Sequence, residues 1–217
     1  MDSTFWQDRW NNNQIAFHSH HPEPLLITYY PALRQAMQHR PAPHVLVPLC
    51  GKSTDMMWLR AQGATVTGIE LCRLAVEQFF AENRLTPVIT RQGELECFST
   101  DGLIVFAGNI ADLTPDLLPP VHAVYDRAAL VALPGDMRPA YAARTMALSR
   151  CAPQLLITCE YDQSLLSGPP FSVTSDDIQH CYGSVLDAEQ LDRKEIPGGL
   201  KGRCPASDAA WLLTARA

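Results

Sequence analysis

Residues 45–70 constrain the fold of this chain more than any other stretch, because they contain strand, glycine turn, helix, second strand and terminal acid in that order. The first apolar run ends at Gly51, as is typical of a buried parallel strand that enters a tight turn. Ser53 favours a helix start with a hydroxyl N-cap, and Gly63 is expected to end that helix. We therefore predict a βαβ unit of a parallel sheet, with Glu70 at the carboxyl end of its second strand.

The glycine turn and the terminal acid of this unit indicate a ligand that contains ribose. An acid about 20 positions beyond such a turn accepts hydrogen bonds from ribose hydroxyls. Gly51 is the only glycine in the turn, so a dinucleotide fingerprint is incomplete, and Leu46 stands where a Walker A loop needs its first glycine. S-adenosylmethionine has ribose without pyrophosphate and fits one glycine and one acid. An ordinary βαβ unit with a solvated Glu70 remains the alternative.

Composition limits the other function classes. The chain has 217 residues, of which 47% are hydrophobic and 18% charged, and this suits one α/β domain with a sizeable core. A formal net charge of -6 argues against a nucleic-acid partner, which needs a basic surface. No signal peptide or membrane span is visible, so we predict a cytoplasmic protein without membrane contact. Seven scattered cysteines without a CxxC pair fit that compartment and form no zinc motif.

The N-terminal segment is rich in aromatic residues, and two interpretations of it stay open. Trp6 and Trp10 are four positions apart and therefore fall on one helical face. This face either covers the core as an ordinary amphipathic helix or forms a lid that approaches a sulfonium cation, a contact that gains roughly 0.5–2 kcal/mol. The nearby His18, His20 and His21 have no partnering acids at ligand spacing, so we predict no metal site.

Helical and strand patterns alternate along the rest of the chain, without an internal repeat. A helix is expected over residues 25–37, with an interruption near Pro31. Residues 86–107 predict short strands with a hairpin turn at Asp101 and Gly102. The remaining predictions are a strand over 121–125, a helix over 134–150, a strand over 155–161, a helix over 176–182 and a terminal antiparallel hairpin of 185–196 with 209–215.

Polar residues follow two of the predicted strands at the end where a doubly wound sheet binds its ligand. Asn109 follows the strand over 103–107, so we expect an adenine contact there, although loop polarity alone also explains this residue. Asp126 and Arg127 end the strand over 121–125. Their charges indicate a role in the crevice, and the alternative is a local ion pair between the two side chains.

A series of motifs gives the whole chain a family resemblance. FWQDRW, IAFH, VLVPLCGKSTDMMWL, GIEL, VYDRAAL, ITCEYDQ and GPPFSV occur in this order. With this series the chain resembles bacterial thiopurine S-methyltransferases from about residue 4 to its end. The resemblance implies a single Rossmann-like class I methyltransferase domain over residues 41–217, with a seven-stranded, mostly parallel sheet whose last strand is reversed. Residues 1–40 would form an N-terminal helical lid of the same domain.

The same resemblance implies roles for individual residues. Contacts to the donor S-adenosylmethionine are implied at Trp10, Leu49, Glu70 and Arg127. Phe17, Pro170 and Phe171 would border the acceptor. Two departures stand out. The family usually has an aspartate where Asn109 stands, and residues 201–208 lack the longer basic segment that often precedes the last strand.

We expect methyl transfer from S-adenosylmethionine to the sulfur of thiopurines and other aromatic or heterocyclic thiols, which leaves S-adenosylhomocysteine. A sulfonium donor and a thiolate acceptor neutralise each other as the methyl group moves, and a dry pocket helps this step. Orientation then supplies up to about 7–11 kcal/mol, with Arg127 as the catalytic candidate that steadies the acceptor's charge or the donor's position.

Two further classes stay open: a methyltransferase that acts on selenium, tellurium or halide species, and a non-catalytic protein that binds S-adenosylmethionine. We also expect a monomer whose partner is a small thiol.

Overall fold

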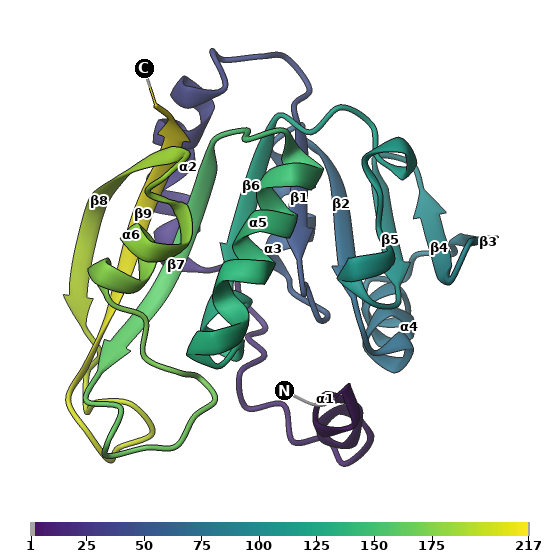
Figure 1. Cartoon of the computed structure of the whole chain (residues 1–217). Coiled ribbons are helices and arrows are strands. Elements are labelled where there is room, and N and C mark those ends of the chain that lie inside the picture. Colours follow the sequence, from purple (N-terminus) through teal and green to yellow (C-terminus); the bar gives the residue numbers. More distant parts are fainter. Residues whose placement is uncertain (1–2, 217) are drawn as a thin grey trace.

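One mixed sheet runs through the whole molecule, with helices on both of its faces (Figure 1). The computed structural model describes residues 3–216, apart from the side chain of Ser3. The sheet has nine strands in the order β3-β4-β5-β2-β1-β6-β7-β9-β8. The strands are β1 His44–Pro48, β2 Thr65–Glu70, β3 Val88–Gln92, β4 Leu95–Thr100, β5 Leu103–Ala107, β6 Ala123–Arg127, β7 Gln154–Tyr161, β8 Leu186–Glu195 and β9 Ala206–Ala215.

The helices alternate with these strands along the chain. The α-helices are α1 Ser3–Asn11, α2 Pro24–Ala36, α3 Asp55–Ala61, α4 Arg73–Glu82, α5 Arg138–Ser149 and α6 Ser175–Tyr182. Four single-turn 3₁₀ helices are η1 Ile110–Asp112, η2 Pro115–Leu117, η3 Leu130–Ala132 and η4 Gly135–Met137. These bounds confirm the βαβ unit and the helices and strands predicted beyond it, to within a few residues at their ends.

The neighbouring strands β5, β2, β1, β6 and β7 are all parallel. The strand β1 is buried along its whole length, as expected for a strand covered on both faces, and this explains its continuous apolar sequence. The carboxyl ends of these strands lie on one side of the sheet, which is the lower side in Figure 1, and α1 lies beyond them.

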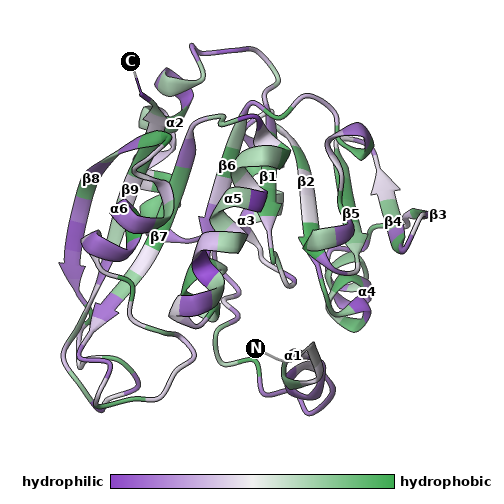
Figure 2. Ribbon diagram, viewed as in Figure 1, coloured by the Kyte–Doolittle hydropathy of each residue, from purple (hydrophilic) through white to green (hydrophobic). Residues whose placement is uncertain are grey.

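Helices α2, α3 and α4 cover one face of the sheet, and α5 and α6 cover the other (Figure 1). The inner strands are apolar, whereas the edge strand β8 is mostly hydrophilic (Figure 2). Leu26, Leu33, Phe79 and Tyr125 are fully buried in the core under α2 to α4. Burial of each such side chain stabilises the fold by about 1.5–3 kcal/mol. No helix within residues 3–216 is long and apolar enough to cross a membrane.

The strand count corrects the seven strands expected from the resemblance. Seven strands form the expected sheet, and its last strand is reversed as predicted, because β9 is antiparallel to β7. The two additional strands, β3 and β4, form an antiparallel hairpin that extends the β5 edge. The hairpin turns at Gly93, which has φ of 62°, and Leu95 and Phe98 of β4 bury their side chains. This apolar face makes pairing with β5 favourable and accounts for the larger sheet.

The helix α2 corrects a second expectation, because it continues through Pro31 without an interruption. Proline removes one backbone donor and crowds the carbonyl group one turn earlier, at Ile27. Both Pro31 and Ile27 lie on the exposed side of α2, where water can satisfy the freed carbonyl. The buried residues on the opposite side, including Leu26 and Leu33, then hold the helix together by packing.

Candidate active site

A cavity of about 1190 Å³ lies at the carboxyl ends of the central strands, where doubly wound sheets bind their ligands. The turns after β1, β2 and β5 line one half of it. The ends of β6 and β7, the start of β9 and the loop before α6 line the other half. The segment between α1 and α2 contributes a further wall.

Glu70 ends β2 and forms part of the first half of this cavity. Its two carboxylate oxygens accept hydrogen bonds from the backbone N–H of Gly51 at 2.9 Å and of Cys72 at 2.8 Å. Burial raises the pKa of the Glu70 carboxyl, and these backbone bonds lower it in part. Because the two oxygens of a carboxylate together offer about four acceptor positions, Glu70 keeps acceptor capacity for a hydroxyl group of a ligand.

The turn after β1 needs glycine at Gly51 for two reasons. Its φ of 52° lies in the left-handed region, and a Cβ atom would stand 3.1 Å from the Trp10 ring. Leu49, two residues earlier, is also left-handed with φ of 45°, so the turn is tight and strained. Trp10 lies over it, buried against Cys72 and its neighbours at the start of α4. Both Trp10 and Leu49 line the cavity, as the resemblance implies for donor contacts.

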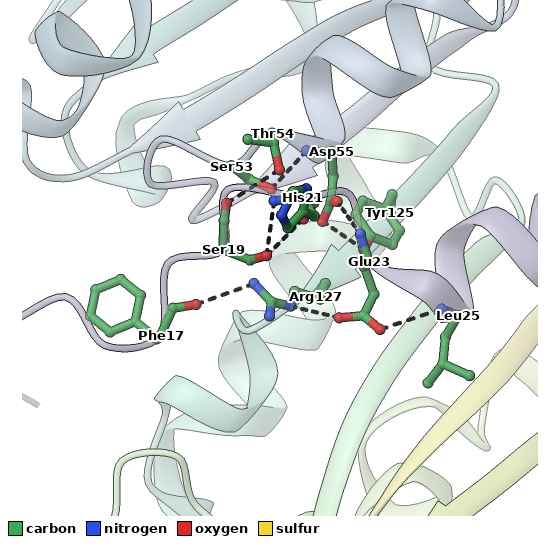
Figure 3. Close-up of polar contacts among 10 residues, drawn as sticks. All are labelled: Phe17, Ser19, His21, Glu23, Leu25, Ser53, Thr54, Asp55, Tyr125 and Arg127. Atoms are coloured by element: carbon green, nitrogen blue, oxygen red, sulfur yellow. Dashed lines mark hydrogen bonds and ion pairs between the residues drawn. The ribbon is translucent and has the colours of Figure 1, made fainter. Parts of the chain in front are cut away.

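The segment between α1 and α2 is fastened to the scaffold by Asp55, the first residue of α3 (Figure 3). Its Oδ1 accepts from the backbone N–H of Glu23 at 2.8 Å, and its Oδ2 accepts from the Tyr125 hydroxyl at 2.9 Å. The adjacent Thr54 hydroxyl donates to the carbonyl of Ser19 at 3.3 Å. These bonds hold the cavity wall against α3 and β6.

Arg127 ends β6 and points toward the same wall (Figure 3). Its Nη1 donates to the carbonyl of Phe17 at 3.4 Å, and its Nε lies 3.5 Å from Oε2 of Glu23. The Arg127 side chain is 26% exposed and lines the cavity, so its remaining N–H groups can reach a ligand.

Asp126 does not pair with Arg127, so the alternative of a local ion pair is wrong. Its Oδ2 accepts from the Tyr141 hydroxyl at 2.6 Å, and its Oδ1 accepts from the backbone N–H of Leu130 at 3.2 Å. Neighbouring residues of a strand point to opposite faces, which separates Asp126 from Arg127. Burial raises the pKa of Asp126 to about 6. Asp126 therefore fixes the start of η3, and residues of η3 line the cavity.

Aromatic rings form the outer part of the wall. Phe17 lines the cavity, is 38% exposed and makes edge contacts with Trp6 and Trp10 at 5.8 and 5.7 Å between ring centroids. The rings of His18 and His20 meet at 4.9 Å, and burial together with nearby Lys52 lowers the pKa of His18. Across residues 3–216, no three metal-ligating side chains converge on one point.

The third turn of the first half follows β5. Asn109 lines the cavity, and its Oδ1 accepts from the backbone N–H of Ala111 at 2.9 Å, so its carbonyl group caps η1. Arg144 of α5 donates to the carbonyls of Ile110, Ala111 and Leu113 and holds this turn in place. Sequence analysis missed Arg144, because one arginine on a helix carries no signal of the distant carbonyls that it binds.

The loop before α6 reaches the cavity through its prolines. Pro169 and Pro170 line the cavity, and the Tyr161 hydroxyl donates to the Pro170 carbonyl at 2.6 Å. Phe171 is not among the described residues that line it. Its backbone N–H donates to Val131, and its ring packs so closely on Gly168 that a Cβ atom there would lie 2.6 Å away. The structure thus brings Pro170, but not the Phe171 ring, to the cavity wall.

Glu23, Cys159, Lys201 and Asp208 complete the second half of the cavity and were not singled out from the sequence. Lys201 donates to the carbonyl of Pro169 at 2.9 Å. Asp208 is the acid within the apolar run of β9, and this break in the pattern is the one signal that marks it in the sequence.

The sequence model of the family described as Thiopurine S-methyltransferase (TPMT) matches residues 1–202 of the chain. The Thiopurine S-methyltransferase of Gluconobacter oxydans is 48% identical over 213 residues, which cover 98% of this chain and 95% of that protein. The Thiopurine S-methyltransferase of Xanthobacter autotrophicus is 48% identical over 214 residues, with 98% and 99% coverage.

Solved structures of lower sequence identity share the fold. A SAM-dependent methyltransferase from Anabaena variabilis superposes with a TM-score of 0.62 at 14% identity, covering 99% of this chain and 95% of that one. The 1,6-didemethyltoxoflavin-N1-methyltransferase of Burkholderia thailandensis, solved with 1,6-didemethyltoxoflavin and S-adenosylhomocysteine, gives a TM-score of 0.61 at 17% identity, with 98% and 87% coverage. The mixed α/β sheet is therefore the class I fold of SAM-dependent methyltransferases.

Proposed function

The chain belongs to the thiopurine S-methyltransferase family, and on this premise we propose that it transfers the methyl group of S-adenosylmethionine to the sulfur of a thiopurine or another aromatic or heterocyclic thiol. One observation carries the proposal. Glu70, with both oxygens held by backbone N–H groups, stands at the end of the cavity that the fold reserves for a nucleoside.

The donor occupies the half of the cavity formed by the first three turns. Glu70 accepts the ribose hydroxyls, since its carboxylate keeps acceptor capacity beyond the backbone bonds that hold it. Asn109 and the η1 turn, which Arg144 fixes, border the adenine. Trp10 and Leu49 enclose the donor beside the Gly51 turn. The resemblance implies an aspartate at this position; the amide nitrogen of Asn109 adds a donor where a carboxylate only accepts.

The acceptor occupies the half of the cavity around Arg127. Phe17 and Pro170 provide apolar walls for an aromatic ring, and the Phe171 ring packs on Gly168 of the same loop. Arg127 is the catalytic candidate, because its guanidinium carries a positive charge at the end of β6 and lines the cavity. It steadies the negative charge of the thiolate as this group loses its water.

The reaction is a direct displacement. A lone pair of the acceptor sulfur forms the new S–C bond, and the electron pair of the donor's C–S bond returns to the donor sulfur, which leaves S-adenosylhomocysteine. Positive sulfonium and negative thiolate become two neutral thioethers, so charge disappears and an apolar, water-poor site helps. The protein mainly orients the two sulfurs in line, an effect of up to about 7–11 kcal/mol.

We extend the proposal to the lid over residues 1–40, of which residues 1 and 2 lie outside the described part of the chain. The helix α2 packs into the main core, so the movable part is the segment before Glu23. Its contacts to Asp55, Thr54 and Arg127 support a lid that closes over the donor. We further propose a cytoplasmic monomer that acts on a small thiol and binds no nucleic acid, in keeping with the net charge of -6.

Two measurements on the purified chain test this function. Calorimetry should show binding of S-adenosylmethionine and S-adenosylhomocysteine, and both ligands should raise the unfolding midpoint. Turnover should then be measured with 6-mercaptopurine, thiophenol, selenide and iodide, and the two thiols should be methylated on sulfur. Absence of donor binding at millimolar concentration contradicts the proposal. Binding without any turnover indicates a non-catalytic protein, and turnover of selenide or iodide alone indicates the other acceptor class.

A further inference from the structure

Asp208 is a carboxylate in the acceptor half of the cavity to which the function proposed above gives no role. It lies on β9 directly opposite Cys159 of β7, and both side chains line the cavity. Asp208 is half-buried, and it makes no ion pair within 4 Å anywhere in residues 3–216. Burial and Glu23 raise the pKa of the Asp208 carboxyl, and Arg127 and the Cys159 thiol on the neighbouring strand lower it in part. A carboxylate in this setting has acceptor positions to spare.

The charges around Asp208 come from each element that packs against it. Glu23, before α2, adds negative charge, and Arg127 of β6 adds positive charge that the ion pair with Glu23 already offsets. Lys194 of β8 is the pairing neighbour of Asp208, but its amino group binds Asp192 at 2.8 Å. Two acids, Glu23 and Asp208, therefore share this half of the cavity with Arg127 and with Lys201, whose amino group donates to the carbonyl of Pro169. The Asp208 carboxylate itself repels an acceptor with its own carboxylate and favours one that offers an N–H donor.

Heterocyclic thiols differ from aryl thiols in this respect. In the thione tautomer of a heterocyclic thiol, the proton sits on a ring nitrogen beside the thiocarbonyl carbon. Methylation on sulfur then gives a neutral product only when this N–H proton is lost. A carboxylate within reach of the ring N–H can both recognise such a compound and remove its proton.

We propose that Asp208 binds the ring N–H of heterocyclic thiol acceptors and takes this proton as the methyl group moves. The N–H bond breaks, its electron pair shifts through the ring to sulfur, and sulfur forms the S–C bond while the C–S bond of the donor breaks. The carboxylate becomes a carboxyl and later returns the proton to water. This role rests on the proposed methyl transfer. Burial and the nearby Glu23 raise the pKa of Asp208, which makes it a stronger base than an ordinary aspartate.

The test compares Asp208→Asn with the unchanged chain on two acceptors of similar size, 2-mercaptopyridine, which has a ring N–H as the thione, and thiophenol, which has none. The amide oxygen of Asn still accepts the N–H, so KM for 2-mercaptopyridine should change little, whereas kcat should fall about 100-fold because no base remains. Methylation of thiophenol should stay within about twofold of the unchanged chain. In the unchanged chain, kcat for 2-mercaptopyridine should fall as the pH drops through the pKa of Asp208, and the variant should lose this limb.

Two controls keep the result interpretable. Asp187→Asn makes the same change on the neighbouring strand β8, at a residue paired with Arg216 and outside the cavity lining, and should alter neither acceptor. The affinity for S-adenosylhomocysteine shows whether Asp208→Asn is folded. Should this variant fail to fold, Asp208→Glu retains a carboxylate and should keep the preference for 2-mercaptopyridine.

Equal losses for both acceptors would give Asp208 a purely structural role, and unchanged kinetics for both would remove its role altogether; either result overturns the proposal. Failure of the proposed function looks different, because the unchanged chain would then methylate neither thiol.

Discussion

The two halves of the cavity are built in different ways. In the donor half, backbone N–H groups of Gly51 and Cys72 hold Glu70 at 2.9 and 2.8 Å; Gly51 and Glu70 belong to one βαβ unit, and Cys72 follows it directly. In the acceptor half, Arg127 meets the N-terminal segment through side-chain contacts of 3.4 and 3.5 Å, and Asp208 joins from the last strand. Main-chain geometry thus fixes the donor half, while the acceptor half depends on side chains that can change without altering the fold.

This difference fits one donor used with several acceptors. A carboxylate held by two backbone bonds is already oriented before the ligand arrives, so binding loses little entropy. Long side chains such as Arg127 lose rotamer freedom when they hold a ligand, but they can adjust to rings of different shape. We therefore expect changes in the donor half to act on affinity, and changes in the acceptor half to act on rate and selectivity.

The largest effect should come from Asp55, the residue that joins the segment between α1 and α2 to α3 and β6. Asp55→Ala leaves the buried Tyr125 hydroxyl and the backbone N–H of Glu23 without their acceptor. Two bonds to a charged group are lost, so unfolding in urea should show a destabilisation of about 3–5 kcal/mol. Asp116→Ala, an exposed acid in η2, is the control and should stay within about 0.5 kcal/mol. A loss under about 1 kcal/mol would mean that the wall is not anchored through Asp55.

A pH-dependent effect should come from Asp126, beneath the acceptor half. Its folded pKa of about 6 lies above its ordinary value of 3.8, so the folded state binds more protons between these values. The contribution of Asp126 to stability is then fully present below pH 3.8 and is lost as the pH rises through about 6. The full shift corresponds to about 3 kcal/mol.

Asp126→Asn cannot titrate, and its amide can serve both Tyr141 and Leu130. The difference in unfolding free energy between the unchanged chain and this variant, measured in urea from pH 4 to pH 7, should therefore decrease with rising pH. A difference that is constant across this range would show that Asp126 titrates normally in the fold. Affinity for S-adenosylhomocysteine at pH 7 should not change, because Asp126 is not part of the donor half.

Glu70→Ala tests the donor half directly. On the proposed function, the substitution removes the acceptor of the ribose hydroxyls, whose bonds change little between the ground state and the transition state, so KM for the donor should rise more than kcat falls. The expected loss is about 1.5–3 kcal/mol in calorimetric affinity for S-adenosylhomocysteine. Glu94→Ala, an exposed acid in the turn between β3 and β4, should bind the ligand as the unchanged chain does. An effect of Glu70→Ala confined to kcat would place Glu70 in the chemistry and would break the comparison of the two halves.

Arg127→Ala tests the acceptor half and should have a smaller effect. We expect kcat to fall roughly tenfold, or about 1.4 kcal/mol, with an ionised thiol and less with a neutral one. Arg127→Lys should restore the rate only in part, because a point charge does not reproduce the planar guanidinium. Steady-state kinetics of both variants with one ionised and one neutral acceptor decide this. A rise in the donor's KM with unchanged kcat for both acceptors would make Arg127 a donor-binding residue.

Much of the donor half could be predicted from the sequence. The apolar run before Gly51, the helix that starts near Ser53 and the acid at Glu70 lie within one short window, and the physical rules that relate them are local. The hairpin turn at Asp101 and Gly102 was likewise confirmed between β4 and β5. The count of seven strands was wrong because it came from the resemblance, whereas the β3 and β4 hairpin is decided by the burial of Leu95 and Phe98.

The sequence by itself determined the parallel βαβ core through hydrophobic periodicity and turn chemistry, and its motif order indicated the family, whose resemblance implied the reversed last strand. Only the tertiary structure decided that α2 continues through Pro31, that Asp126 and Arg127 point to opposite sides, and that Asp208 shares a cavity with Arg127. The physical reason is distance along the chain. Contacts between residues far apart in sequence form only when the strands pair in their final register. Local sequence preferences do not encode which side chains then meet.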